Sequence, residues 1–89
     1  MNEAFRWNEW NEDHIASHGI WAGEAEYVIN NAFRPYPEDI GGGKWMVRGQ
    51  APNGRYIQVV FIIETDCYYV IHARPLKENE KRQFRRRLR

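Results

Sequence analysis

The stretch from Arg55 to Glu64 constrains the possible folds of this chain more than any other segment. Every second residue from Ile57 to Ile63 is apolar, whereas the residues between them mix polar and apolar side chains. This alternation is typical of a β-strand, because successive side chains of a strand point to opposite faces of the sheet. One apolar face and one mixed face predict a central strand with helices behind it and a polar-rimmed cleft in front.

Turn signals on both sides of this segment predict an antiparallel sheet. Pro52-Asn53-Gly54 precedes it, with proline fixing φ and Asn-Gly tolerating positive φ, and Thr65-Asp66 follows it. Lys44 to Gln50 and Cys67 to Arg74 also suit strands, so we expect both to run antiparallel to the central one. Pro75 is expected to end the sheet.

Two helices are expected before the strands in the sequence, and one helix is expected after them. Asn8 suits the N-cap of a helix over Glu9 to Ser17, which His18-Gly19 should end. A second helix is expected over Ala22 to Ile29, and a highly charged final helix over Lys77 to Leu88. Phe5-Arg6-Trp7 suits a short strand. Pro35 and Pro37 should break any helix, and Gly41-Gly42-Gly43 predicts a tight or mobile turn. The side chains expected to face inward are Trp10, His14 or Ile15, and His18 in the first helix, Ala25, Val28 and Ile29 in the second, and Phe84 and Leu88 in the last.

Composition narrows the class of protein. A chain of 89 residues with 15% aromatic side chains is large enough for one folded domain, over residues 1–89. Its single cysteine, Cys67, cannot form an internal disulfide, and no apolar run approaches the roughly 20 residues that span a bilayer. The N-terminus lacks the basic-then-apolar order of a signal peptide, so a cytoplasmic location is expected.

Charge is distributed unevenly along the chain, although the net value is only +1. Up to Gly43 there are two basic and eight acidic residues, whereas from Lys44 onward there are eleven basic and four acidic residues. The second half is therefore where a polyanion such as nucleic acid is expected to bind. The acidic first half could repel nucleic acid from one side or present a surface to a basic partner protein.

His72 and Arg74 indicate a phosphate site near the end of the last strand. Side chains two residues apart on a strand project from the same face, roughly 7 Å apart. An imidazole can move a proton and a guanidinium can hold negative charge, and a reacting phosphate needs both. The alternative is that Arg74 is a solvated strand end and His72 a histidine satisfied by its surroundings.

Several short motifs, in their order along the chain, resemble the BrnT family of bacterial ribonuclease toxins. They are Phe5-x-Trp7, His18-Gly19-Ile20 before a helix, Gly54-Arg55-Tyr56 before an apolar strand, and Ala73-Arg74 followed by Glu80-Lys81-Arg82. The resemblance covers nearly the whole chain and implies an α+β fold of the RelE-like kind, with two N-terminal helices packed on an antiparallel sheet and a C-terminal helix. It also implies metal-independent, cofactor-free cleavage of RNA and silencing by a cognate antitoxin, as in a type II toxin–antitoxin pair.

The chain departs from that family at a few positions. His72 stands where a serine is usual and adds a titratable group, and Asn8 stands where an acidic residue is usual. The Pro35-Tyr36-Pro37 segment and the three glycines after it are also unusual. The alternative function is therefore a catalytically silent RNA- or protein-binding module on the same fold.

Cleavage of RNA without a metal needs a base, an acid and a cation near the phosphate. Arg74 is the candidate cation, with Arg55 and Arg48 close by across the hairpin unless those two pair with acidic neighbours. His72 is the candidate acid or base, with packing or simple RNA contact as the alternative. Glu64 could orient a cation or act as a base, or it could be a surface carboxylate.

His18 is a further candidate for the active site, although its place before a glycine also suits a cation that caps the first helix. His14 and His18 lie four residues apart and could share a metal ion, but no third ligand with suggestive spacing accompanies them. The sequence therefore predicts no metal site, and any nuclease activity is expected to survive EDTA. Cys67 has no paired base in view, which argues against a thiol nucleophile.

Basic residues near the C-terminus are the expected RNA contacts. They could neutralise several phosphates or receive an acidic antitoxin segment, or they could simply form a solvated helix that frays at its end. The candidate RNA-binding residues are Arg48, Lys81, Arg82, Arg85 and Arg86.

Overall fold

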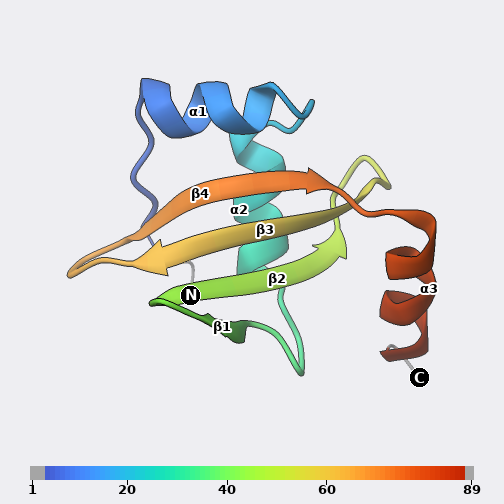
Figure 1. The fold of residues 1–89 in the computed structure, drawn as a ribbon. Coiled ribbons are helices and arrows are strands. Elements are labelled where there is room, and N and C mark those ends of the chain that lie inside the picture. Colours follow the sequence, from blue (N-terminus) through green and yellow to red (C-terminus); the bar gives the residue numbers. More distant parts are fainter. Residues whose placement is uncertain (1–3, 88–89) are drawn as a thin grey trace.

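Within residues 4–87, which the structure describes, four antiparallel strands form one sheet in the order β1-β2-β3-β4. Figure 1 shows this sheet and the three helices around it in a computed structural model. The strands are β1 (Glu38–Gly41), β2 (Lys44–Gln50), β3 (Tyr56–Ile63) and β4 (Tyr68–Pro75). The helices are α1 (Glu9–Ala16), α2 (Ala22–Asn30) and α3 (Glu78–Arg87). The expected α+β fold is confirmed, with two N-terminal helices, an antiparallel sheet and a C-terminal helix.

The core lies between α2 and one face of the sheet, with α2 behind the strands in the view of Figure 1. Ile57, Val59 and Phe61 of β3 are at most 1% exposed, which confirms the apolar face predicted for the central strand. Ile63 is 55% exposed, because it lies at the very end of β3 beside the turn into β4. The residues of α2 predicted to face inward, Ala25, Val28 and Ile29, are all buried.

Helix α1 begins at the predicted N-cap, Asn8. The side-chain oxygen of Asn8 accepts a hydrogen bond from the backbone N–H of Asn11 (3.2 Å), and the side-chain oxygen of Asn11 accepts one from the backbone N–H of Asn8 (2.8 Å). This capping box satisfies two N–H groups that the helix itself leaves unpaired. Ile15 is buried, but the inward positions predicted for Trp10 and His18 are wrong, since both side chains are exposed. Because α1 lies along the edge strand β4, it buries only a narrow stripe and leaves Trp10 84% exposed.

The end of α1 is fixed by Gly19, as the sequence predicts. Gly19 has a φ of 76°, a left-handed conformation that glycine adopts without steric strain. Its N–H donates to the carbonyl of Ala16 (2.8 Å), and the N–H of Ile20 donates to the carbonyl of Ile15 (3.0 Å). These two bonds, with Ile15 and Ile20 both buried, form a Schellman motif. The motif holds His18 in a defined place directly after the helix.

Strand β1 lies outside the sequence predictions. It is a short edge strand that pairs with β2, with Glu38 opposite Met46. The three consecutive glycines from Gly41 to Gly43 all have positive φ, and Gly42 and Gly43 form the tight turn between the two strands. The strand predicted for Phe5-Arg6-Trp7 is reduced to a single parallel bridge between Phe5 and Tyr68.

Helix α3 packs on the rest of the molecule through Phe84, which is buried as predicted. Its ring centroid lies 5.8 Å from that of Phe33, 6.3 Å from that of Tyr36 and 5.9 Å from that of Tyr56. Leu88, the other predicted contact of this helix, lies outside the described residues. Among residues 4–87, no helix combines the length and the apolar character needed to cross a membrane.

Candidate functional site

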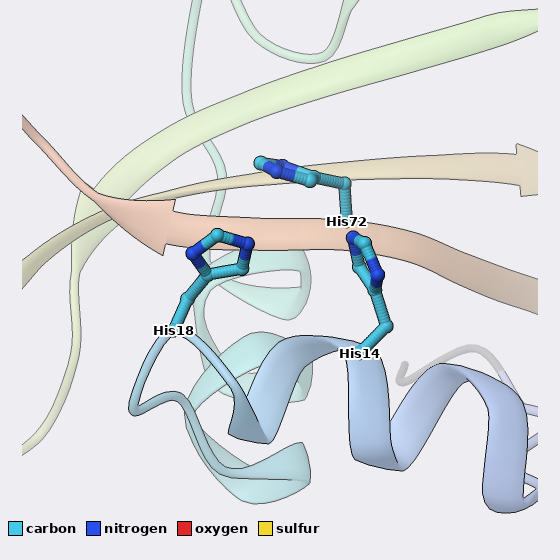
Figure 2. A group of neighbouring side chains, drawn as sticks. All are labelled: His14, His18 and His72. Carbon is cyan, nitrogen blue, oxygen red and sulfur yellow. The ribbon is translucent and has the colours of Figure 1, made fainter.

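All three histidines of the chain meet in one place, which we call the histidine cluster (His14, His18 and His72). Figure 2 shows His14 projecting from α1, His18 from the turn after it, and His72 from β4. The ring centroids are 5.6 Å apart for His14 and His18, 5.3 Å for His14 and His72, and 5.1 Å for His18 and His72. One nitrogen of each ring lies within 4.8 Å of the other two.

The cluster follows from how α1 sits against the sheet. His14 lies in the last turn of α1, and the Schellman motif places His18 directly after that turn, so the two imidazoles meet while Ile15 points into the core. Strand β4 is the outermost strand on this side of the sheet, so a side chain on it can meet α1 at the edge. The sequence predictions treat His18 and His72 as separate candidates, and only the tertiary contact reveals that they join His14.

The imidazole of His72 is the most enclosed of the three, since His14 and His18 are exposed. Burial lowers the pKa of His72, and the nearby His18, His14 and Arg74 lower it further by charge repulsion. Among residues 4–87, no side-chain hydrogen bond or ion pair engages any of the three imidazoles. Their nitrogens are therefore available to a proton, a phosphate or a metal ion.

Arg74 projects from the same face of β4 as His72, as predicted. His72 pairs with Val60 and Arg74 with Gln58, two positions that share one face of β3. The guanidinium of Arg74 donates from Nη1 and Nη2 to the two carboxylate oxygens of Glu80, each at 2.8 Å. Nη1 also donates to the carbonyl of Pro75 (3.1 Å). The predicted phosphate-binding group is thus held in place by an acidic partner that the sequence analysis does not single out.

Glu80 joins α3 to the sheet. Besides Arg74, its carboxylate accepts hydrogen bonds from Nη2 of Arg48 (3.2 Å) and from the backbone N–H of Lys77 (2.7 Å). The hydrogen bonds from Arg74 are the main cause that lowers the pKa of Glu80 to about 2. Arg48 also donates to the side-chain oxygens of Gln58 and Gln83 (3.0 and 3.3 Å), so it is engaged within the protein.

Arg55 lies beside the turn that carries His18. Its Nη2 donates to the carbonyl of Gly19 (2.6 Å), and its Nε lies 3.4 Å from a carboxylate oxygen of Glu24. Both Arg48 and Arg55 therefore pair with acidic residues, although these partners lie on α3 and α2, whereas the alternative interpretation expects them across the strands. Arg55 nevertheless remains exposed, with 42% of its side chain accessible, and it contacts the residue that follows His18.

Glu64 lies away from the cluster. It directly follows the last residue of β3 and lies four residues after Val60, the partner of His72, which is roughly 13 Å for an extended chain. Nε and Nη2 of Arg6 each donate to its carboxylate at 2.8 Å and hold its pKa at about 2. The thiol of Cys67 donates to the same carboxylate (3.4 Å), and burial is the first cause that raises the thiol's pKa. A thiolate nucleophile is disfavoured here, in agreement with the sequence analysis.

The basic residues of α3 are mostly accessible. Arg82, Arg85 and Arg86 are exposed, and within the described chain no ion pair engages them. The guanidinium of Arg85 lies over the ring of Tyr56, 5.3 Å from its centroid. Lys81 pairs with Glu78 on its own helix (3.3 Å). Helix α3 therefore offers exposed cations, and its Glu80 contacts Arg74 of β4.

A hollow of about 500 Å³ opens beside the histidine cluster and was missed by the sequence analysis. It is lined by Glu9, Trp10, Asp13, His14 and Ser17. The exposed ring of Trp10 offers a flat face on which a nucleic-acid base can stack next to an imidazole. The helical spacing of the sequence does not reveal this hollow, because that spacing predicts Trp10 on the buried side of α1.

Comparisons of the chain with models of known protein families, with curated proteins and with solved structures found no match. The candidate site is accordingly defined by its own geometry. The structure brings His18, His72 and Arg74 to one region, adds His14 and Glu80 to them, and places Glu64 elsewhere.

Proposed function

We propose that this chain is a ribonuclease toxin that cleaves RNA without a metal ion and is neutralised by a cognate antitoxin. The observation that carries the proposal is the histidine cluster, three proton-carrying side chains in contact at one accessible site. Arg74, on the same face of β4 as His72, supports it with a fixed positive charge. The resemblance to BrnT toxins points to the same activity.

In the proposed reaction one imidazole of the cluster takes the proton of a ribose 2′-OH, whose oxygen attacks the neighbouring phosphorus. A second imidazole, already protonated, gives its proton to the 5′-oxygen as the bond from phosphorus to that oxygen breaks. One proton is taken and one is given, so the pair as a whole keeps its charge. The products are an RNA end with a 2′,3′-cyclic phosphate and an end with a 5′-hydroxyl.

Arg74 is proposed to stabilise the negative charge that grows on the phosphate oxygens during this reaction. Its contacts with Glu80 and the Pro75 carbonyl leave the Nε–H and one Nη2 hydrogen for a phosphate. Glu80 fixes the orientation of the guanidinium, and a preorganised donor stabilises a transition state better than a mobile one.

The arginines of α3 are proposed to hold the RNA backbone, which gives a prediction about salt. The double substitution Arg82→Gln with Arg86→Gln should lower the slope of log affinity against log salt by about 1.4, since each phosphate contact on a single strand contributes about 0.7. Lys44→Gln, at the opposite end of β2 from α3, is the control and should change the slope little. Equal slopes for the wild type and the double variant, measured by fluorescence anisotropy, would contradict this role of α3.

The experiment that tests the toxin proposal is expression in bacteria without an antitoxin. The wild type should arrest growth, whereas His72→Ala at a matched soluble level should not. Cys67→Ser is the control. Its thiol is hydrogen-bonded to Glu64 and lies outside the histidine cluster, so this variant should arrest growth like the wild type. Normal growth of cells that contain soluble wild-type protein would overturn the proposal.

The second candidate, a silent binding module, is favoured by one specific observation. Arg74 and Arg48 both donate to Glu80, so their charges are partly used inside the protein. A silent module would still bind RNA with a steep salt dependence, but it would leave the RNA intact. Turnover, and not affinity, separates the two candidates.

A further inference from the structure

The histidine cluster has a property that the proposed function does not use. It contains every histidine of the chain and no carboxylate, and two of its three side chains are exposed rather than buried in the core. Packing therefore gives little reason for three imidazoles to gather here. Their nitrogens are also free of hydrogen bonds and ion pairs within residues 4–87.

We propose that His14, His18 and His72 bind one divalent transition-metal ion of the zinc class, with a fourth coordination position left open to water. α1 supplies His14, the turn directly after it supplies His18, and β4 supplies His72, the third ligand that the sequence spacing does not reveal. Imidazole nitrogens suit zinc, copper, nickel and cobalt, whereas magnesium and calcium prefer oxygen ligands.

The distances allow this site to close around an ion. With metal–nitrogen bonds of about 2.0–2.1 Å, the nitrogens of a tetrahedral site lie about 3.3 Å apart. The three nitrogens already lie within 4.8 Å of one another, so each pair must approach by at most about 1.5 Å. His14 and His18 are exposed, so their imidazoles have room to turn about their side-chain bonds toward a shared ion.

A bound ion would also affect the proposed cleavage, and this consequence rests on the proposed function. The ion and the RNA reaction compete for the same imidazole lone pairs, because a coordinated nitrogen cannot take a proton. The metal-loaded protein should therefore cleave RNA more slowly than the metal-free protein. Metal binding itself requires only the geometry of the cluster and would stand without any nuclease activity.

The binding test is a titration of the EDTA-treated and desalted protein with cobalt(II), followed by visible absorption. The wild type should give a saturable tetrahedral-type spectrum at one ion per chain, and His14→Ala and His72→Ala should each weaken binding at least 100-fold. Cys67→Ser, the control, should bind like the wild type, since its sulfur lies outside the cluster. A spectrum that never saturates, one that is unchanged in His72→Ala, or one ion shared by two chains would overturn the proposed site.

A second measurement covers the case in which a variant does not fold. Zinc at 100 times its Kd should raise the folded-to-unfolded ratio of the wild type about 100-fold, because the ion binds only the native arrangement of α1 and β4. No change in the thermal midpoint with zinc would overturn the site without reference to any variant.

RNA cleavage by the same samples separates the two proposals. Slower cleavage by the zinc-loaded wild type supports both of them. Saturable binding with no cleavage in either form supports the metal site and overturns the nuclease. If zinc binds and cleavage becomes faster, the metal site is supported and metal-independent cleavage is overturned. If zinc binds and cleavage is unchanged, the imidazoles of the cluster carry no proton in the reaction.

Discussion

Replacing His72 with alanine is expected to slow RNA cleavage by about 10²-fold or more under single-turnover conditions, with little change in RNA affinity. A positioned acid or base contributes about 10² to 10⁴ to the rate of a proton-transfer reaction. His72 lies close to both other imidazoles, at 5.3 and 5.1 Å between ring centroids, and it is the imidazole that shares a face of β4 with Arg74. His14 and His18 remain in the variant, but neither lies on the strand that carries the proposed phosphate-binding arginine. Rates measured with enzyme in excess over RNA report the chemical step alone.

Two further variants make this result interpretable. Cys67→Ser should cleave at the wild-type rate, because it lies beside Glu64 and outside the cluster. His72→Ser introduces the serine that the proposed resemblance to BrnT toxins would place here and should be as slow as His72→Ala. Full activity in either His72 variant, with the fold intact by circular dichroism, would contradict a catalytic role for this imidazole.

Glu80→Gln is expected to lower the free energy of unfolding by about 2 kcal/mol at pH 7. The carboxylate is buried with 11% of its side chain accessible, and its loss leaves Arg74 and Arg48 without their acidic partner. The shift of its pKa from an ordinary 4.5 to about 2 corresponds to roughly 3 kcal/mol, which access of water to the arginines reduces. Urea denaturation of both proteins measures the difference.

The same carboxylate gives the stability of the protein a defined pH dependence. Because folding lowers the pKa of Glu80, its contribution is fully present above pH 4.5 and is lost as pH falls toward 2. The gap in unfolding free energy between wild type and Glu80→Gln should therefore shrink by about half at pH 3.

Glu78 provides a matched control on the same helix. Its carboxylate is 77% exposed and pairs only with Lys81, so Glu78→Gln should change stability by less than about 0.5 kcal/mol at any of these pH values. Equal effects of the two substitutions would show that Glu80 has no special place in linking α3 to the sheet.

Local chemistry explains why much of the fold is predictable from the sequence. The cap at Asn8 and the stop at Gly19 set α1, and the alternation from Ile57 to Phe61 sets β3. These features depend on neighbours a few residues away, which a sequence displays directly. Strand β1 is not predictable in this way, because its pairing with β2, and not its own residues, makes it a strand.

The candidate site is less predictable, because its contacts join distant segments. The same-face placement of His72 and Arg74 follows from strand geometry and is correct. Neither the meeting of His14 with His72 nor the capture of Arg74 by Glu80 follows from spacing, since each depends on how a helix docks against β4. The exposure of Trp10 is missed for the same reason.

The central claim is that the histidine cluster cleaves RNA by moving protons, and the chemistry of the product ends tests it most directly. A defined single-stranded RNA would be incubated in EDTA with the wild type, or with a triple variant carrying alanine at positions 14, 18 and 72, and its ends analysed by mass spectrometry. We expect 2′,3′-cyclic phosphate and 5′-hydroxyl ends from the wild type and intact RNA from the triple variant. Intact RNA with the folded wild type, or the same ends at the same rate from the triple variant, would contradict the claim.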